Sequence, residues 1–153
     1  MIYEELFVYL RKIKEFCEKE HIDVVFYASP LHANALYDIE YQGVYDKLEL
    51  FKRDLVKITP FYDFLYVCDW SDKPITTDNP YWIDVFHSDQ PLGYVMLERL
   101  VKNKGTFGKY ITKDNIEKEL KTDKQNLEKY AKNNAKYLKK YVTYGHLDDS
   151  PEE

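Results

Sequence analysis

An aspartate and a histidine lie three positions apart in the stretch "IDVFHSDQPLG", residues 83–93. In an acid–base–nucleophile triad, histidine removes the proton of the nucleophile and a carboxylate holds the imidazole in the correct tautomer. Asp84 and His87 can be fixed by one tight turn, with one ring nitrogen on the carboxylate and the other facing a substrate. Asp-x-x-His is also common by chance, so a polar loop before a helix is the competing interpretation.

A nucleophile for this pair is harder to find. Ser29 ends a strand-like run and Ser88 follows His87, but neither has the glycine-flanked sharp turn that exposes a nucleophilic serine. His32 and Trp82 are candidates for lining a pocket together with Ser29. The simpler interpretations are that His32 makes local hydrogen bonds at a helix start and that Trp82 packs the loop.

Metal and cofactor chemistry is not predicted. No set of His, Asp and Glu shows the spacing of metal ligands. Cys17 and Cys68 form no Cys-x-x-Cys pair, which disfavours a zinc site or a disulfide framework, and both are predicted to be small buried apolar residues. Asp63 is expected to satisfy backbone groups instead of doing chemistry.

The elements that must position the pair follow from hydrophobic periodicity. Helices are predicted at 2–20, 31–41, 44–58 and 91–103, with Pro60 ending the third, and a long last helix at 113–141 with Thr112 as its cap. Leu6, Leu10, Ile13 and Cys17 form the predicted inner stripe of the first helix. Apolar runs at 21–30 and 61–68 predict two buried parallel strands. A polar, proline-containing loop at 69–82 precedes the Asp-x-x-His stretch, and residues 146–153 are predicted to be a disordered tail.

This order predicts an α/β fold with few strands and a long C-terminal helix. Two parallel strands leave open edges of backbone groups and exposed apolar faces. We therefore expect the chain to self-associate or to pair with a missing N-terminal half.

Composition excludes several classes of protein. The chain has 153 residues, 44% of them hydrophobic, and a net charge of −5, which disfavours a nucleic-acid partner. No run is long enough to span a membrane. The start lacks the features of a signal peptide, so the sequence as given suggests a cytoplasmic protein. The 15 tyrosines indicate half-buried positions or, alternatively, a partner-binding or sugar-binding face.

Three stretches, in order, resemble a known family. "VVFYASPLHANAL", "FKRDLVKITPFYDFLYVCDW" and "IDVFHSDQPLGYVMLERL" are similar to the C-terminal part of SGNH (GDSL-like) hydrolases, specifically the bacterial branch that modifies cell-surface polysaccharide and teichoic acid. The resemblance covers roughly residues 1–102. It implies a flavodoxin-like three-layer domain, Asp84 as the residue that orients His87, His87 as the general base, and a place in the cell envelope.

The chain departs from the family because the Gly-Asp-Ser nucleophile block and the oxyanion-hole residues are absent. The resemblance thus implies the C-terminal portion of an SGNH-like domain at 1–110, a helical extension at 111–145 and the tail. The expected function is part of an esterase or acyltransferase for O-acyl groups of a bacterial surface glycan, inactive alone. The alternative is a non-catalytic interaction or assembly module.

Overall fold

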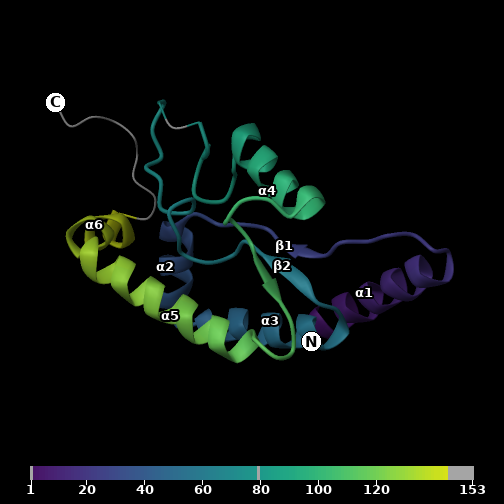
Figure 1. Cartoon of the computed structure of the whole chain (residues 1–153). Coiled ribbons are helices and arrows are strands. Elements are labelled where there is room, and N and C mark those ends of the chain that lie inside the picture. The colour runs from purple at the N-terminus through teal and green to yellow at the C-terminus, as the bar shows by residue number, and fades with distance from the viewer. Residues whose placement is uncertain (1, 79, 145–153) are drawn as a thin grey trace.

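The computed structural model describes residues 2–78 and 80–144 (Figure 1). The predicted tail, residues 146–153, lies outside this part of the chain. The elements are, in chain order, α1 (Ile2–Lys19), β1 (Tyr27–Ala28), α2 (Ala33–Tyr41), α3 (Tyr45–Ile58), β2 (Phe61–Asp63), α4 (Gln90–Lys102), β3 (Lys109–Ile111), α5 (Ile116–Asn133) and α6 (Ala135–Tyr144). Among the described helices, none combines the length and the apolar character needed to cross a bilayer.

The three strands form one sheet in the order β1-β2-β3. β1 is parallel to β2, with Tyr27 opposite Tyr62, and β2 is antiparallel to β3, with Phe61 opposite Ile111. The predicted α/β class is confirmed. The prediction of only two strands is wrong, because the end of the glycine-marked stretch "KGTFGKY" pairs with β2 as a third strand. The flavodoxin-like assignment stays a prediction.

Helices cover both faces of this sheet, with α4 on one side and α2, α3 and α5 on the other (Figure 1). The larger apolar cluster joins the sheet to α1, α2, α3 and α5, and includes Phe7, Leu36, Leu55, Phe61, Ile111 and Leu120. The smaller cluster lies under α4 and comprises Phe64, Trp82, Leu92, Met96 and Phe107. On α4, Leu92 and Met96 are buried, and Val95 and Leu100 are partly buried against this cluster. α5 contributes Ile116, Leu120 and Leu127 to the larger cluster.

The inner stripe predicted for α1 is only half right. Cys17 is buried and Leu10 is partly buried against the core, but Leu6 and Ile13 are 47% and 48% exposed. The buried side of the helix is rotated toward Phe7, whose ring stacks on Phe51 of α3 at 5.7 Å. α1 thus keeps an apolar side that the described chain does not cover.

The first predicted strand is shorter than expected, and most of it is exposed. Only Tyr27 and Ala28 pair with β2, while Val24 and Val25 are 40% and 52% exposed. The burial prediction for this run is wrong because β1 lies at the edge of the sheet. A continuous apolar run is buried on both sides only when neighbouring elements cover it.

The single long C-terminal helix is also a wrong prediction, because the segment forms two helices separated at Asn134. The first begins at Ile116, later than expected. Thr112 does not cap a helix start at 113. Its hydroxyl accepts from the N–H of Asp114 at 3.3 Å, and its own N–H donates to the Asn115 side chain at 2.8 Å. These bonds form a turn between β3 and α5.

A glycine determines the backbone path that leads into β3. Gly108 has φ +90°, and a Cβ built there would lie 2.4 Å from Cε1 of Phe64. Gly105 also has a positive φ, +82°, but has nothing within 4 Å of such a Cβ. Gly108 is therefore required both by the left-handed backbone and by the Phe64 ring packed against it.

Candidate functional site

The Asp84–His87 stretch is a small closed loop in front of α4. Trp82 and Ser88 form an isolated antiparallel bridge, and the N–H of Ile83 donates to the carbonyl of His87 at 2.9 Å. Asp89 then begins α4 as its N-cap, with a proline in the first turn. The turn chemistry and the helix cap together hold the loop at one end of α4.

Within this loop Asp84 binds three N–H groups. Its Oδ1 accepts from the backbone N–H groups of Phe86 and His87, both at 2.7 Å. The ring Nδ1 of His87 lies 2.7 Å from Oδ2 and 2.9 Å from Oδ1. The predicted hydrogen bond between the two side chains is confirmed, and their catalytic role stays a prediction.

The electrostatics agree with an ionised carboxylate. The slight burial of the Asp84 carboxyl acts to raise its pKa, but the hydrogen bonds from His87 and from the two backbone N–H groups outweigh this and hold the pKa below its usual value. An ionised carboxylate only accepts hydrogen bonds, which assigns the Nδ1–H tautomer to neutral His87. Nε2 then carries the free lone pair, the arrangement that a general base needs.

His87 lies on the wall of a groove of about 450 Å³, which we call the His87 groove. Tyr27 and Ser29, at the carboxyl end of β1, line it together with Phe86, and α4 adds Met96, Leu97 and Leu100. The His87 side chain is 70% exposed. The fold thus brings Ser29, His87 and the end of β1 to one concave surface, the edge at which open α/β sheets bind ligands.

His32 and Trp82 lie elsewhere, in the interior. His32 is the N-cap of α2: its Nδ1 accepts from the N–H of Asn34 at 3.1 Å, and its Nε2 lies 2.8 Å from the carbonyl oxygen of Lys73. The interpretation of His32 as a helix-start residue with local hydrogen bonds is confirmed. Trp82 is 3% exposed, and its indole N–H donates to the carbonyl of Trp70 at 2.8 Å.

The roles of these bonds fix the protonation of His32. Because Nδ1 accepts a hydrogen bond, Nε2 must carry the proton and donate it to the Lys73 carbonyl. Burial lowers the pKa of His32, and the Lys73 carbonyl opposes that effect only in part. His32 is therefore a neutral structural residue that ties the long loop to α2.

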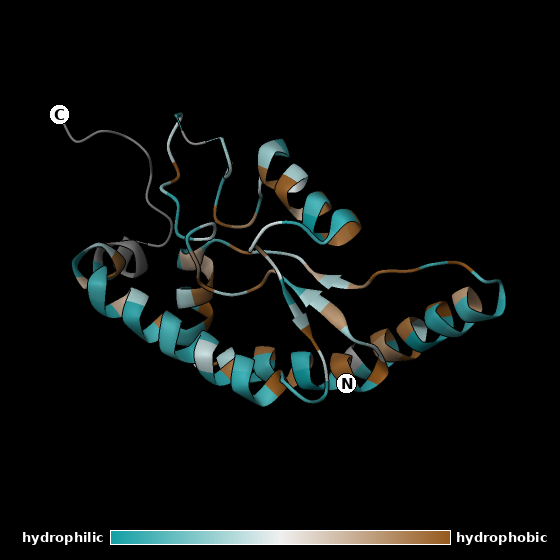
Figure 2. Ribbon diagram, in the orientation of Figure 1, coloured by the Kyte–Doolittle hydropathy of each residue, from teal (hydrophilic) through white to brown (hydrophobic). Residues whose placement is uncertain are grey.

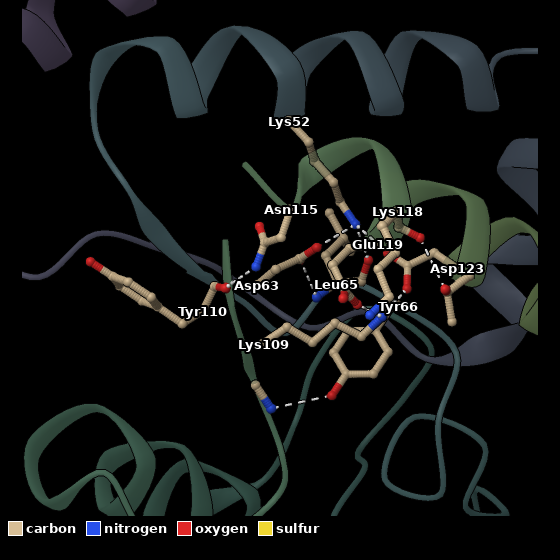
Figure 3. Close-up of polar contacts among 12 residues, drawn as sticks. Lys52, Asp63, Leu65, Tyr66, Lys109, Tyr110, Asn115, Lys118, Glu119 and Asp123 are labelled. Atoms are coloured by element: carbon tan, nitrogen blue, oxygen red, sulfur yellow. Dashed lines mark hydrogen bonds and ion pairs between the residues drawn. The ribbon is translucent and has the colours of Figure 1, made fainter. Parts of the chain in front are cut away.

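A second group of charged side chains lies between β2, α3 and α5 (Figure 3). Lys52 is 1% exposed, and its Nζ donates to the Leu65 carbonyl at 2.6 Å and pairs with Asp63 at 2.7 Å and with Asp123 at 3.4 Å. Lys109 of β3 also pairs with Asp123. We call these residues the Lys52 network.

The Lys52 network is structural. Each carboxylate in it has a partner, and Asp63 also accepts from the N–H of Leu65 at 2.8 Å, as the sequence-based interpretation of Asp63 expected. Sequence reasoning missed Lys52 because it lies in an amphipathic helix rich in charges, where lysines are normally exposed. Its partner Asp123 is distant in sequence, so no local pattern indicated the pair.

Two further observations bear on what the site can hold. Among residues 2–78 and 80–144, no group of three or more His, Cys, Asp or Glu side chains is placed to bind a metal ion. Comparisons of the chain with protein-family models, with curated proteins and with solved structures find no match.

Proposed function

We propose that Asp84 and His87 are the orienting carboxylate and the general base of an SGNH-like esterase or O-acyltransferase acting on O-acyl groups of a bacterial surface glycan. The observation that carries the proposal is the hydrogen bond from His87 Nδ1 to the Asp84 carboxylate, at 2.7 Å, on the exposed wall of a groove. The sequence resemblance of residues 1–102 supports the same roles.

In the proposed reaction, Nε2 of His87 accepts a proton and later returns it. As a serine oxygen attacks the acyl carbon, Nε2 takes the hydroxyl proton, and the ionised Asp84 stabilises the imidazolium. The tetrahedral intermediate collapses, the glycan oxygen leaves with the proton from Nε2, and an acyl-serine remains. Water or a second hydroxyl then attacks this ester by the same proton route, which regenerates the serine.

We propose that the nucleophile comes from a complementary polypeptide half that adds a strand to β1. β1 is an edge strand, and edge strands offer unpaired N–H and C=O groups to another chain. The His87 groove lies at the carboxyl end of β1. A strand added parallel to β1 would end on the same side, so a serine following it would come close to His87.

Ser29 is the alternative nucleophile within this chain. Its side chain lies on the His87 groove and is exposed, although no glycine flanks it. The family's oxyanion-hole residues are absent from this sequence, and such donors are worth about 10²–10³ in kcat. We therefore expect the isolated chain to hydrolyse p-nitrophenyl acetate no faster than its His87→Ala variant.

The experiment measures p-nitrophenyl acetate turnover by this chain alone and together with an SGNH N-terminal half that carries a Gly-Asp-Ser block. We expect turnover only for the pair, and its loss with His87→Ala or Asp84→Asn. A pair that is equally active with His87→Ala would end the general-base assignment. Turnover by the isolated chain that requires both His87 and Ser29 would make Ser29 the nucleophile.

A second candidate function, an assembly module, is favoured by a separate observation. α1 exposes Leu6, Tyr9, Ile13 and Phe16, with exposed fractions of 47%, 62%, 48% and 57%. Their spacing of three and four residues places them on one side of the helix, as in a helix-packing seam. Figure 2 shows the apolar residues along α1 and along the chain that returns from it to β1. A soluble protein rarely leaves such a stripe uncovered.

A further inference from the structure

A second cavity, of about 390 Å³, lies away from the His87 groove. One wall is the segment after β2, from Tyr66 to Asp72, and the other is α5. Asn126, Lys129, Tyr130 and Asn133 of α5 line it, and their spacing of three and four residues puts them on one side of the helix. We call this the α5 cavity.

Several polar groups of the α5 cavity are not bonded to another described residue. Within the described part of the chain, the side chains of Asp69, Asn126, Lys129 and Asn133 make no hydrogen bond or ion pair with another residue. The Lys52 network, one turn away on α5, differs in this respect because each of its carboxylates is paired. Unpaired groups that converge on a concave surface are typical of a binding site.

The indole ring of Trp70, in the wall of the α5 cavity, is held in place by its neighbours before any ligand binds. Trp70 lies at a centroid distance of 5.3 Å from Tyr81 in an edge-to-face contact and at 5.9 Å from Phe107. The ring is half-buried, so part of it remains at the cavity. A ring held by its neighbours loses little entropy when a ligand packs on it.

The charges and hydrogen-bonding groups narrow the ligand class. Asp69 and Asp72 outnumber Lys129 by one negative charge, which disfavours phosphorylated or carboxylated ligands. The carboxylates accept, Lys129 donates, and the two asparagines do both. A hydroxyl group donates and accepts through a single atom, so a ligand with several hydroxyls suits this mixture of donors and acceptors, and the apolar face of a sugar ring packs against an aromatic side chain.

We propose that the α5 cavity binds a neutral saccharide. The hydroxyls would bond to Asp69, Asn126, Lys129 and Asn133, and the ring would pack on Trp70. This inference rests on the contacts of the α5 cavity and not on the acyl-transfer proposal. The two can fail separately, because none of these residues lines the His87 groove.

Saturation-transfer NMR and calorimetry on the full chain test the proposal with glucose, N-acetylglucosamine and their short oligomers, at up to about 10 mM. We expect at least one sugar to bind. The Asn126→Ala variant should weaken binding about tenfold or more, and Asp69→Ala combined with Asn126→Ala should abolish it. Gln125→Ala is the matched control, since Gln125 is the neighbouring amide on α5, is exposed, and does not line the cavity.

Folding is checked by circular dichroism, because these exposed or half-buried positions should leave the melting temperature unchanged. Binding that survives Asn126→Ala with Asp69→Ala would overturn the proposal. So would an absence of binding across the whole panel, or a preference for inorganic phosphate or for the polyamine spermidine over all the sugars.

Discussion

The Asp84–His87 pair forms through local geometry. Asp84 accepts hydrogen bonds from the backbone N–H groups of residues 86 and 87 as well as from the imidazole, so the turn itself places the carboxylate. The pair thus requires few contacts from the rest of the fold. The groove that gives it a substrate requires β1 and α4, which are distant in sequence.

Removing the imidazole should change the titration of its partner. In His87→Ala the side-chain hydrogen bond is lost, while the two backbone N–H groups remain. The pKa of Asp84 should rise from its lowered value part of the way toward the ordinary value of about 3.9. Carbon-detected NMR of the carboxyl group measures this. His21→Ala, which replaces an exposed histidine elsewhere, should leave the Asp84 titration as it is, and an unchanged titration in His87→Ala would refute the hydrogen bond in solution.

His32 should make stability depend on pH. Its pKa is lowered in the folded state, so the unfolded chain binds a proton more readily. The stability that neutral His32 contributes is fully present above the unfolded pKa of about 6.5 and is lost as the pH falls through that value toward the folded pKa.

Urea unfolding between about pH 7.5 and pH 5 tests this. We expect the free energy of unfolding to fall on acidification in the parent chain. His32→Asn keeps a capping side chain for α2 but cannot titrate, so its stability should fall less over the same range. Parallel curves for the two proteins would show that another group is responsible.

At the scale of elements, the sheet depends on how β3 reaches β2. The chain enters β3 through Gly108, packed on the Phe64 ring. Phe64 also contacts Phe107 at a centroid distance of 4.9 Å. The third strand and the cluster under α4 are therefore joined at one point.

Gly108→Ala should be markedly destabilising. The new methyl group would overlap an immobile ring, and the backbone is left-handed, so we expect a loss of about 2–4 kcal/mol from overpacking and strain together. Gly105→Ala shares the positive φ but meets no atom, and should cost only about 1 kcal/mol. Chemical denaturation of both variants gives the comparison. Equal losses would mean that the Phe64 contact adds nothing.

At the scale of the whole molecule, the uncovered side of α1 is the main anomaly. Full burial of an apolar side chain contributes roughly 1.5–3 kcal/mol, and those on this side of α1 are about half exposed, so each forfeits about half of that. Their sum is still large beside a typical stability of about 5–15 kcal/mol. Association through this side would recover part of that free energy.

Charges placed on α1 should therefore prevent association. We expect the parent chain to sediment as a dimer or larger species, and Ile13→Glu with Phe16→Glu to give a monomer. Both residues are exposed, so the melting temperature of the monomer should not fall by more than a few degrees. Val101→Glu, at a position of α4 that is 77% exposed, is the control. A monomeric parent chain would contradict the assembly argument.

The sequence predicted those parts of the fold that local patterns determine. α2, α3 and α4 lie within a few residues of their predicted bounds because amphipathic spacing, Asp89 and Pro60 define them locally. β3 was missed because it is only three residues long and follows glycines. Such a segment has no strand pattern of its own and becomes a strand only by pairing with β2. The burial of Lys52 was missed for a related reason, since it depends on Asp123, another distant partner.

For the candidate site too, the sequence predicted the features that depend on residues close together in the chain. The spacing of Asp84 and His87, together with the family resemblance, led to the expectation of their hydrogen bond. The approach of Ser29 to His87 across one groove was not predictable, because it depends on how α4 packs over the end of β1. The α5 cavity had no sequence signal beyond asparagines and lysines at helical spacing, which also occur on ordinary exposed helix surfaces.

The position of β3 in the sheet has a kinetic consequence. β1 and β2 are joined by α2 and α3, two helices that contact each other and bring the strands together, whereas β3 joins β2 only across the long loop and α4. Pairings of large sequence separation are slow to form, because the intervening chain must first be closed into a loop. We expect the contact between Gly108 and Phe64 to be absent from the folding transition state. Strain introduced there should speed unfolding and leave the folding rate nearly unchanged, so that this chain would lose its third strand first and keep its parallel pair longest.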